Sequence, residues 1–256
     1  MTHTTTQQKQ FRVRDTQSGG LEEAVTANVG ALDAILGPGK THFYWLDFGQ
    51  SRTLPLGPVE GGNWFYAPAR QQVNLLGYYV WGCGMDKPTY VTFLSNILEH
   101  DSSYVEAAYE ALFKLLPSAS SVLCHEQWGD VGLHFRSYQH FAYFLDTLPQ
   151  RWKTAGSLQF LEVEHGKGKI DGMMGRIRQW TNVIASKVVI STVDQYAKLL
   201  QGRADHAMIQ DPDGPRYIFE HLKPPAKSQF GKKILDGPKM GIYCNSTYGS
   251  FSFVCG

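Results

Sequence analysis

Three strand-like runs follow one another between residues 42 and 94, and this succession limits the chain to a few architectures. The runs at residues 42–48, 72–81 and 89–94 are rich in aromatic and β-branched side chains, which favours strands and suggests a meander. Helical spacing and short apolar runs then alternate. Helices are predicted at residues 102–116, 134–148, 171–184 and 193–200, and strands at 121–126, 158–163 and 188–190. We therefore predict an α/β fold with a mixed sheet, an antiparallel meander followed by parallel strands, flanked by helices.

The ends of the chain differ in composition from this central part. Residues 1–20 are polar and predict a flexible N-terminal arm, and residues 21–36 have the apolar spacing of a helix. After residue 202 the chain becomes rich in Pro, Gly and Lys. The predicted organisation is an arm at 1–20, one domain at 21–202, and an irregular C-terminal extension at 203–256 that packs on the domain.

Charge and cysteine content exclude several classes of protein. Charged residues make up 18% of the chain and the net charge is +1, so the chain is not disordered, and any nucleic-acid contact must use a local basic patch. The four cysteines form no CxxC pair, which is typical of a reducing compartment. Without an apolar N-terminal segment or a membrane-spanning stretch, we expect an intracellular protein, nuclear or cytoplasmic, that is not secreted and has no membrane partner.

Four motifs occur in a characteristic order. They are WLDFGQ at residues 45–50, EHD at 99–101, a strand followed by HFRS across 121–137, and HGKGKIDGMMGRIRQW at 165–180. Together they resemble the RNase H-like domain of transposase-derived proteins, over roughly residues 43–195. The last motif is the most specific, because its histidine, lysine, aspartate and the family's glycines match in place, apart from a DGMMG where the family has DGxGG.

The resemblance implies a site built from three carboxylates. Asp47 would stand on the first strand and Asp171 at the start of the last helix, where the helix dipole favours a negative charge. Such acids hold two Mg²⁺ or Mn²⁺ ions for cleavage or strand transfer at a DNA phosphodiester bond. His165, Lys167 and Lys169 would contact the substrate. The resemblance also implies DNA as partner, a role in DNA recombination in the nucleus, and an oligomer.

The second carboxylate departs from the family pattern. Where the family has a Ser-Asp-Gly turn, the predicted strand here ends in Cys-His-Glu, and the stretch up to HFRS is longer by about three residues. Alignment from the strand selects Glu126, and alignment from HFRS selects the neighbourhood of Asp130. Because strand register slips less readily than loop length, the sequence favours Glu126, with Asp130 as the alternative.

Other interpretations of the same residues stay open. Asp47 could be a structural residue at the core edge, Asp171 an ordinary N-terminal helix residue, and Glu126 a surface carboxylate. The main rival is a domain that has lost catalysis and serves as a binding or scaffolding module for a protein or nucleic acid. A resolvase or nuclease acting on branched DNA fits the same motifs. The GPGK at residues 37–40 is no P-loop, because it follows a helix and precedes a strand.

Overall fold

The computed structural model describes residues 34, 36, 39–58, 70–82, 84–97, 101–116, 122–129, 135, 137–160 and 168–223, with the backbone of 243–245 and 250–254. The predicted arm at residues 1–20 and nearly all of the helix predicted at 21–36 lie outside these residues.

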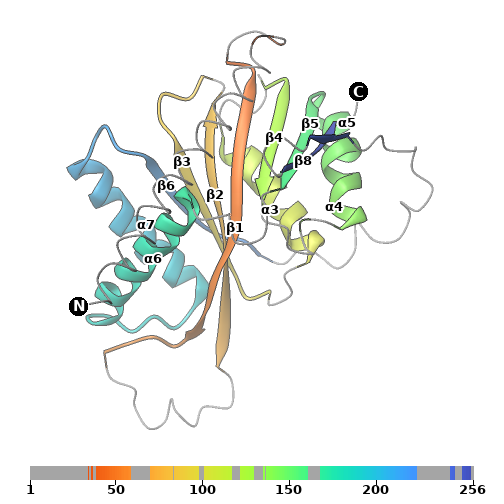
Figure 1. Ribbon diagram of the computed structural model, residues 1–256. Helices are drawn as coiled ribbons and strands as arrows, with labels where there is room; N and C mark the ends of the chain where they lie inside the picture. Colours follow the sequence, from red (N-terminus) through yellow and green to blue (C-terminus); the bar gives the residue numbers. More distant parts are fainter. Residues whose placement is uncertain are drawn as a thin grey trace, which may run out of the picture.

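One mixed sheet runs through the described chain (Figure 1). β1 (Thr41–Leu54), β2 (Gln71–Gly82) and β3 (Thr89–Ser95) form the antiparallel meander. β4 (Cys124–Gly129) pairs parallel with β1, and β5 (Ala155–Phe160) pairs parallel with β4. The order β3-β2-β1-β4-β5 at the centre of the sheet confirms the predicted α/β class and is consistent with an RNase H-like fold.

Helices cover the two faces of the sheet, and alternation along β1 assigns each residue to a face. Phe43 and Trp45 pack in one core with α6 (Lys169–Ala185) and α7 (Val193–Gln210). Tyr44 and Leu46 pack in the other core with α3 (Ser102–Leu115) and the helical segment made of α4 (Tyr138–Ala142), the π-helical η2 (Tyr143–Thr147) and α5 (Leu148–Trp152). In Figure 1, α6 and α7 lie together, on the other side of β1 from α4 and α5.

The C-terminal part, for which the sequence predicts irregular structure with a few strands, contributes strands to this sheet. α7 continues to Gln210, and β6 (Arg216–His221) pairs parallel with β3. On the other side, β8 (Ser250–Val254) pairs with β5, and β7 (Tyr243–Asn245) pairs with β8. Their short apolar patterns were obscured by the Pro, Gly and Lys residues around them. Residue 202, where the predicted domain ends, lies inside α7.

Gln201 on α7 protects the backbone of the edge strand β6. Its side-chain Oε1 accepts a hydrogen bond from Phe219 N at 2.8 Å, and its Nε2 donates to Tyr217 O at 3.2 Å. The amide thus makes the two contacts that a further strand would make. Since open strand edges invite pairing with other chains, Gln201 both satisfies buried backbone groups and blocks that edge.

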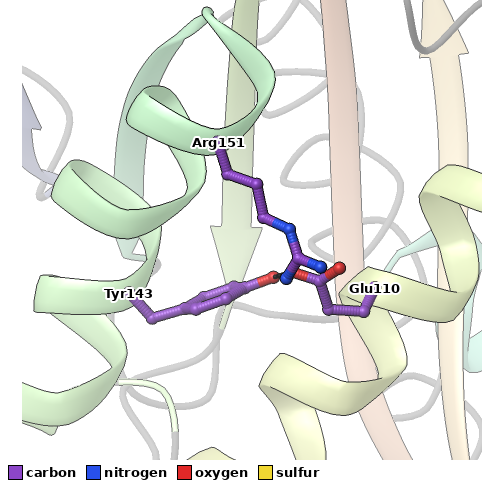
Figure 2. Close-up of polar contacts among 3 residues, drawn as sticks. All are labelled: Glu110, Tyr143 and Arg151. Atoms are coloured by element: carbon purple, nitrogen blue, oxygen red, sulfur yellow. Dashed lines mark hydrogen bonds and ion pairs between the residues drawn. The ribbon is translucent and has the colours of Figure 1, made fainter. Parts of the chain in front are cut away.

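A polar seam joins α3 to α4, η2 and α5. Tyr143 Oη donates to Glu110 Oε1 at 3.1 Å, and Arg151 forms an ion pair with the same oxygen at 2.7 Å (Figure 2). Closer to the start of α3, Ser103 Oγ accepts a hydrogen bond at 3.1 Å from Gln139 of α4. Gln139 also hydrogen-bonds the Glu106 carboxylate. The contacts use residues of α3 that are three or four positions apart and so lie on one side of the helix. They therefore hold α3 along one line against the segment formed by α4, η2 and α5.

Glu106 is the fully buried carboxyl group of this seam. Its side chain is 1% exposed, and Oε1 has no hydrogen-bond partner among the described residues. Burial raises the pKa of Glu106 from 4.5 to about 7; the bond from Gln139 lowers this pKa, and the nearby Asp101 raises it. The folded protein therefore holds the proton that the unfolded chain releases at lower pH.

We expect replacement of Gln201 by Ala to lower the free energy of unfolding by about 1–3 kcal/mol, because two buried backbone groups of β6 lose their partner. Urea unfolding monitored by circular dichroism measures the change. Gln179→Ala, at an exposed position of α6, is the matched control and should stay within about 0.5 kcal/mol of the parent. Equal effects of the two variants would contradict the edge-protecting role.

We expect the unfolding free energy to fall by about 2–3 kcal/mol between pH 5 and pH 8 through Glu106 alone. A raised pKa in the folded state stabilises the fold fully at pH values below the unfolded pKa of 4.5. This stabilisation is lost as the pH rises through about 7. Denaturant melts at several pH values should show that Glu106→Gln lacks this component. The exposed Glu220→Gln control should keep it, and an unchanged pH profile in Glu106→Gln would refute the assignment.

Candidate functional site

Asp47 stands on β1 and faces the α6 side of the sheet. It lies between Trp45, whose side chain belongs to the α6 core, and Gly49, which lies directly under Met174 of α6. The carboxylate is half-buried, and its Oδ1 accepts a hydrogen bond from the backbone of Phe48 at 2.7 Å. Of the acids predicted from sequence, this one therefore sits where strand and helix meet.

Glycines let α6 approach β1 and β2 closely at this point. A Cβ on Gly49 would stand 2.6 Å from Met174 Sδ, and a Cβ on Gly77, the cross-strand partner of Asp47, would strike Met174 Cε. At the start of the helix, a Cβ on Gly168 would overlap the Trp45 ring. The first two turns of α6 therefore contact β1 at two points, one on either side of Asp47.

Asp171 lies midway between these two contacts. It is three residues after Gly168 and three before Met174, so it belongs to the part of α6 that crosses β1 beside Asp47. The side chain is exposed, and its Oδ2 accepts a hydrogen bond from Gly168 N at 3.1 Å, which caps the helix. The structure therefore places Asp47 and Asp171 on the same face of the sheet.

Glu126 occupies the same face but a different level of the sheet. In the parallel register of β1 and β4 it pairs with Phe43, four residues before Asp47, a separation of about 13 Å along the strand. The side chain is fully buried, and Oε1 accepts a hydrogen bond from Trp128 Nε1 at 2.7 Å. The backbone positions of Glu126 and Asp47 therefore stand at different levels of the sheet, and the role of Glu126 as a metal ligand stays a prediction.

The C-terminal end of β4 is relevant to Asp130, the alternative to Glu126 as the second carboxylate. The predicted strand ended at Glu126, whereas β4 runs on to Gly129, which is level with Leu46 when the register is continued from the Trp45–Trp128 pair. Asp130 follows Gly129 in the chain and lies outside the described residues. A polar sequence, Glu-Gln, inside an otherwise short apolar run obscured the true length of the strand.

The remaining predicted residues are only partly described. His165 and Lys167 lie outside the described residues. Lys169 is the exposed first residue of α6, and because successive helix residues are turned by about 100°, it lies on the opposite flank from Asp171. The sequence missed the positioning residues Gly49, Gly77 and Met174; Gly77, inside the predicted strand at 72–81, was the available signal of a close backbone approach.

The described residues fit a divalent metal in part. Asp47 and Asp171 offer the hard carboxylate oxygens that Mg²⁺ and Mn²⁺ prefer. Among the described residues, however, no group of three or more His, Cys, Asp or Glu side chains is placed to hold an ion. A complete site would need a further ligand from a part of the chain beyond the described residues.

Comparisons with known proteins leave the family of this chain open. No protein-family model matches it, and no curated protein sequence does. Among solved structures, the crystal structure of NurA bound to dAMP and manganese is similar over 82% of this chain and 42% of that chain, at 10% identity and a TM-score of 0.15. The chain spans less than half the length of that protein, and so low a score carries no argument about fold or function. Separately, no helix in the described part of the chain has both the length and the apolar character needed to cross a membrane.

Substitution of Gly168 by Ala should destabilise the protein by about 1–3 kcal/mol, because the added methyl group meets the rigid Trp45 ring. Gly172→Ala is the matched control four residues on, since a Cβ there meets open space. It should be neutral or stabilise by up to about 1 kcal/mol through higher helix propensity. Thermal unfolding measures both, and equal stability of the two variants would show that α6 does not depend on this contact.

Proposed function

We propose that the chain is a transposase-type domain that cleaves or transfers DNA phosphodiester bonds with the help of Mg²⁺ or Mn²⁺. The observation that carries the proposal is the placement of Asp47 and Asp171 on one face of an RNase H-like sheet, at the point where α6 crosses β1. The HGKGKIDGMMG motif, which supplies both the glycine contact and Asp171, supports the same family.

Asp130 is the second carboxylate that we favour in this proposal. The family places its second acid at the end of the strand beside β1, and β4 ends at Gly129. Asp130 follows Gly129 directly in the sequence and is the acid that alignment from HFRS selects. Glu126 is then a structural acid, buried against Trp128.

The chemistry assigned to these residues follows from their charge and exposure. Bound divalent ions would activate a water or a 3′-hydroxyl and stabilise the leaving oxygen. The acids would hold the ions as fixed negative charges, and Asp171 is exposed at the helix start. Bonded to Gly168 N, the Asp171 carboxylate is held at the end of α6 that rests on β1.

Nicking of supercoiled DNA in Mn²⁺ or Mg²⁺ tests the proposal. Asp47→Asn, Asp171→Asn and Asp130→Asn should each lose more than about 100-fold in rate, since each would remove a direct metal ligand. Glu126→Gln keeps the oxygen that accepts from Trp128 and should retain the rate within about threefold. Melting curves confirm that the variants are folded.

The outcomes separate the two candidate acids and the rival function. Loss in Glu126→Gln with a normal Asp130→Asn would return the role to Glu126. Full activity in both Asp47→Asn and Asp171→Asn would overturn the proposal. The rival, a binding or scaffolding domain without catalysis, is favoured by the absence of a three-ligand group among the described residues. It predicts no nicking and no heat of Mn²⁺ binding at millimolar concentration.

A further inference from the structure

The two flanks of α6 face different halves of the sheet. Arg176 hydrogen-bonds Tyr217 of β6, and its guanidinium lies 5.6 Å from the centre of the Tyr217 ring. Met174, on the opposite flank, lies over Gly49 of β1 and Gly77 of β2. Because β6 is an edge strand and β1 is central, the Met174 flank is the one turned toward the candidate acids.

Asp171, Gly175 and Arg178 form one stripe along that flank. Their spacing of four and three residues places them on successive turns of the same side of the helix, beside Met174. All three are exposed. The Asp171 and Arg178 positions are about 10 Å apart along the helix axis, at about 1.5 Å per residue.

The middle of the stripe is bare backbone. A Cβ on Gly175 would meet no atom within 4 Å, so no described part of the sheet or of another helix occupies this surface. Glycine inside an exposed helix costs about 1 kcal/mol relative to alanine. It allows another molecule to approach the helix backbone closely.

Arg178 is available to such a molecule. Within the described ranges it has no hydrogen bond or ion pair, in contrast to Arg176 on the other flank. A guanidinium matches phosphate with two parallel hydrogen bonds. Arg178 and the open helix surface beside it therefore complement a phosphodiester backbone, which Asp171 would meet through the metal ions of the proposed function.

We propose that the Asp171–Gly175–Arg178 stripe is the surface along which one strand of the DNA substrate lies, with Arg178 bound to a phosphate about three nucleotides from the cleaved bond. The estimate follows from about 3.4 Å of duplex axis per phosphate of one strand. The inference rests on the proposed function, and it adds a substrate-binding role for Arg178 and Gly175.

Binding of a fluorescent DNA duplex, measured by anisotropy without divalent metal, tests the stripe apart from catalysis. Arg178→Gln should weaken binding about tenfold and reduce the salt dependence by about one counterion. Arg203→Gln, at an exposed position of α7, is the control and should bind within about twofold of the parent. Equal affinity of Arg178→Gln and the parent would overturn the assignment of Arg178.

Gly175→Gln provides a second variant that adds bulk without charge. It should weaken binding at least about threefold while the fold stays stable, because the position is open and Gln favours helix. Gly202→Gln, which also enters open space but on α7, should bind normally. Normal binding by Gly175→Gln would contradict close approach at the stripe.

The two proposals fail in different ways. If the chain nicks DNA but the stripe variants bind like the parent, the stripe is wrong and the proposed function stands. If the chain never nicks DNA but Arg178→Gln and Gly175→Gln lose affinity, the stripe is a nucleic-acid surface of a non-catalytic domain.

Discussion

The contact between α6 and strands β1 and β2 determines where everything else on that side of the sheet can lie. Three glycines remove the side chains that would hold helix and sheet apart, and Met174 fills the space above two of them. α7 belongs to the same buried core, together with β6 at the sheet edge, so the position of α6 is transmitted to the whole layer. A helix seated this closely brings its first turn, which contains Asp171, onto the face of the sheet that carries Asp47.

The opposite face of the sheet is fixed by a different kind of interaction. Tyr44 Oη contacts His125 Nδ1 at 2.7 Å and His42 Nδ1 at 3.0 Å, while Gln127 Oε1 accepts from Tyr109 Oη at 2.7 Å. Burial lowers the pKa of His125 to about 3, an effect that the neighbouring His42 strengthens, so the imidazole is neutral near pH 7. Buried polar groups with satisfied partners specify one arrangement of strands. This face therefore holds β1 and β4 in register, and that register sets the level of any acid on the other face.

The sequence predicted the architecture well because hydrophobic periodicity is a local signal that survives in each element. The meander, the long helices α3 and α6, and the mixed sheet all follow from runs of residues that are buried on one side. Element ends were harder, since β4 contains the polar residues His125, Glu126 and Gln127, whose burial is made possible by Trp128 and by helices distant in sequence. The bounds of the edge strand β6 could not be predicted for a related reason: its pairing with β3 and its cap by Gln201 are long-range contacts.

The predicted end of β4 was three residues too early, and this difference affects the interpretation of the site. Each residue of a strand holds its side chain at a fixed position along the strand. Glu126 and Asp47 share a face, yet the register separates them by four residues of strand. A fully buried Glu126 that accepts from Trp128 is already desolvated and held by a protein donor, whereas Asp47 is half-buried and close to an exposed helix start. Carboxylates that bind the same metal ion must give up bound water and place their oxygens around one point. The level of an acid along its strand, rather than its presence in a motif, therefore decides whether it can belong to the site.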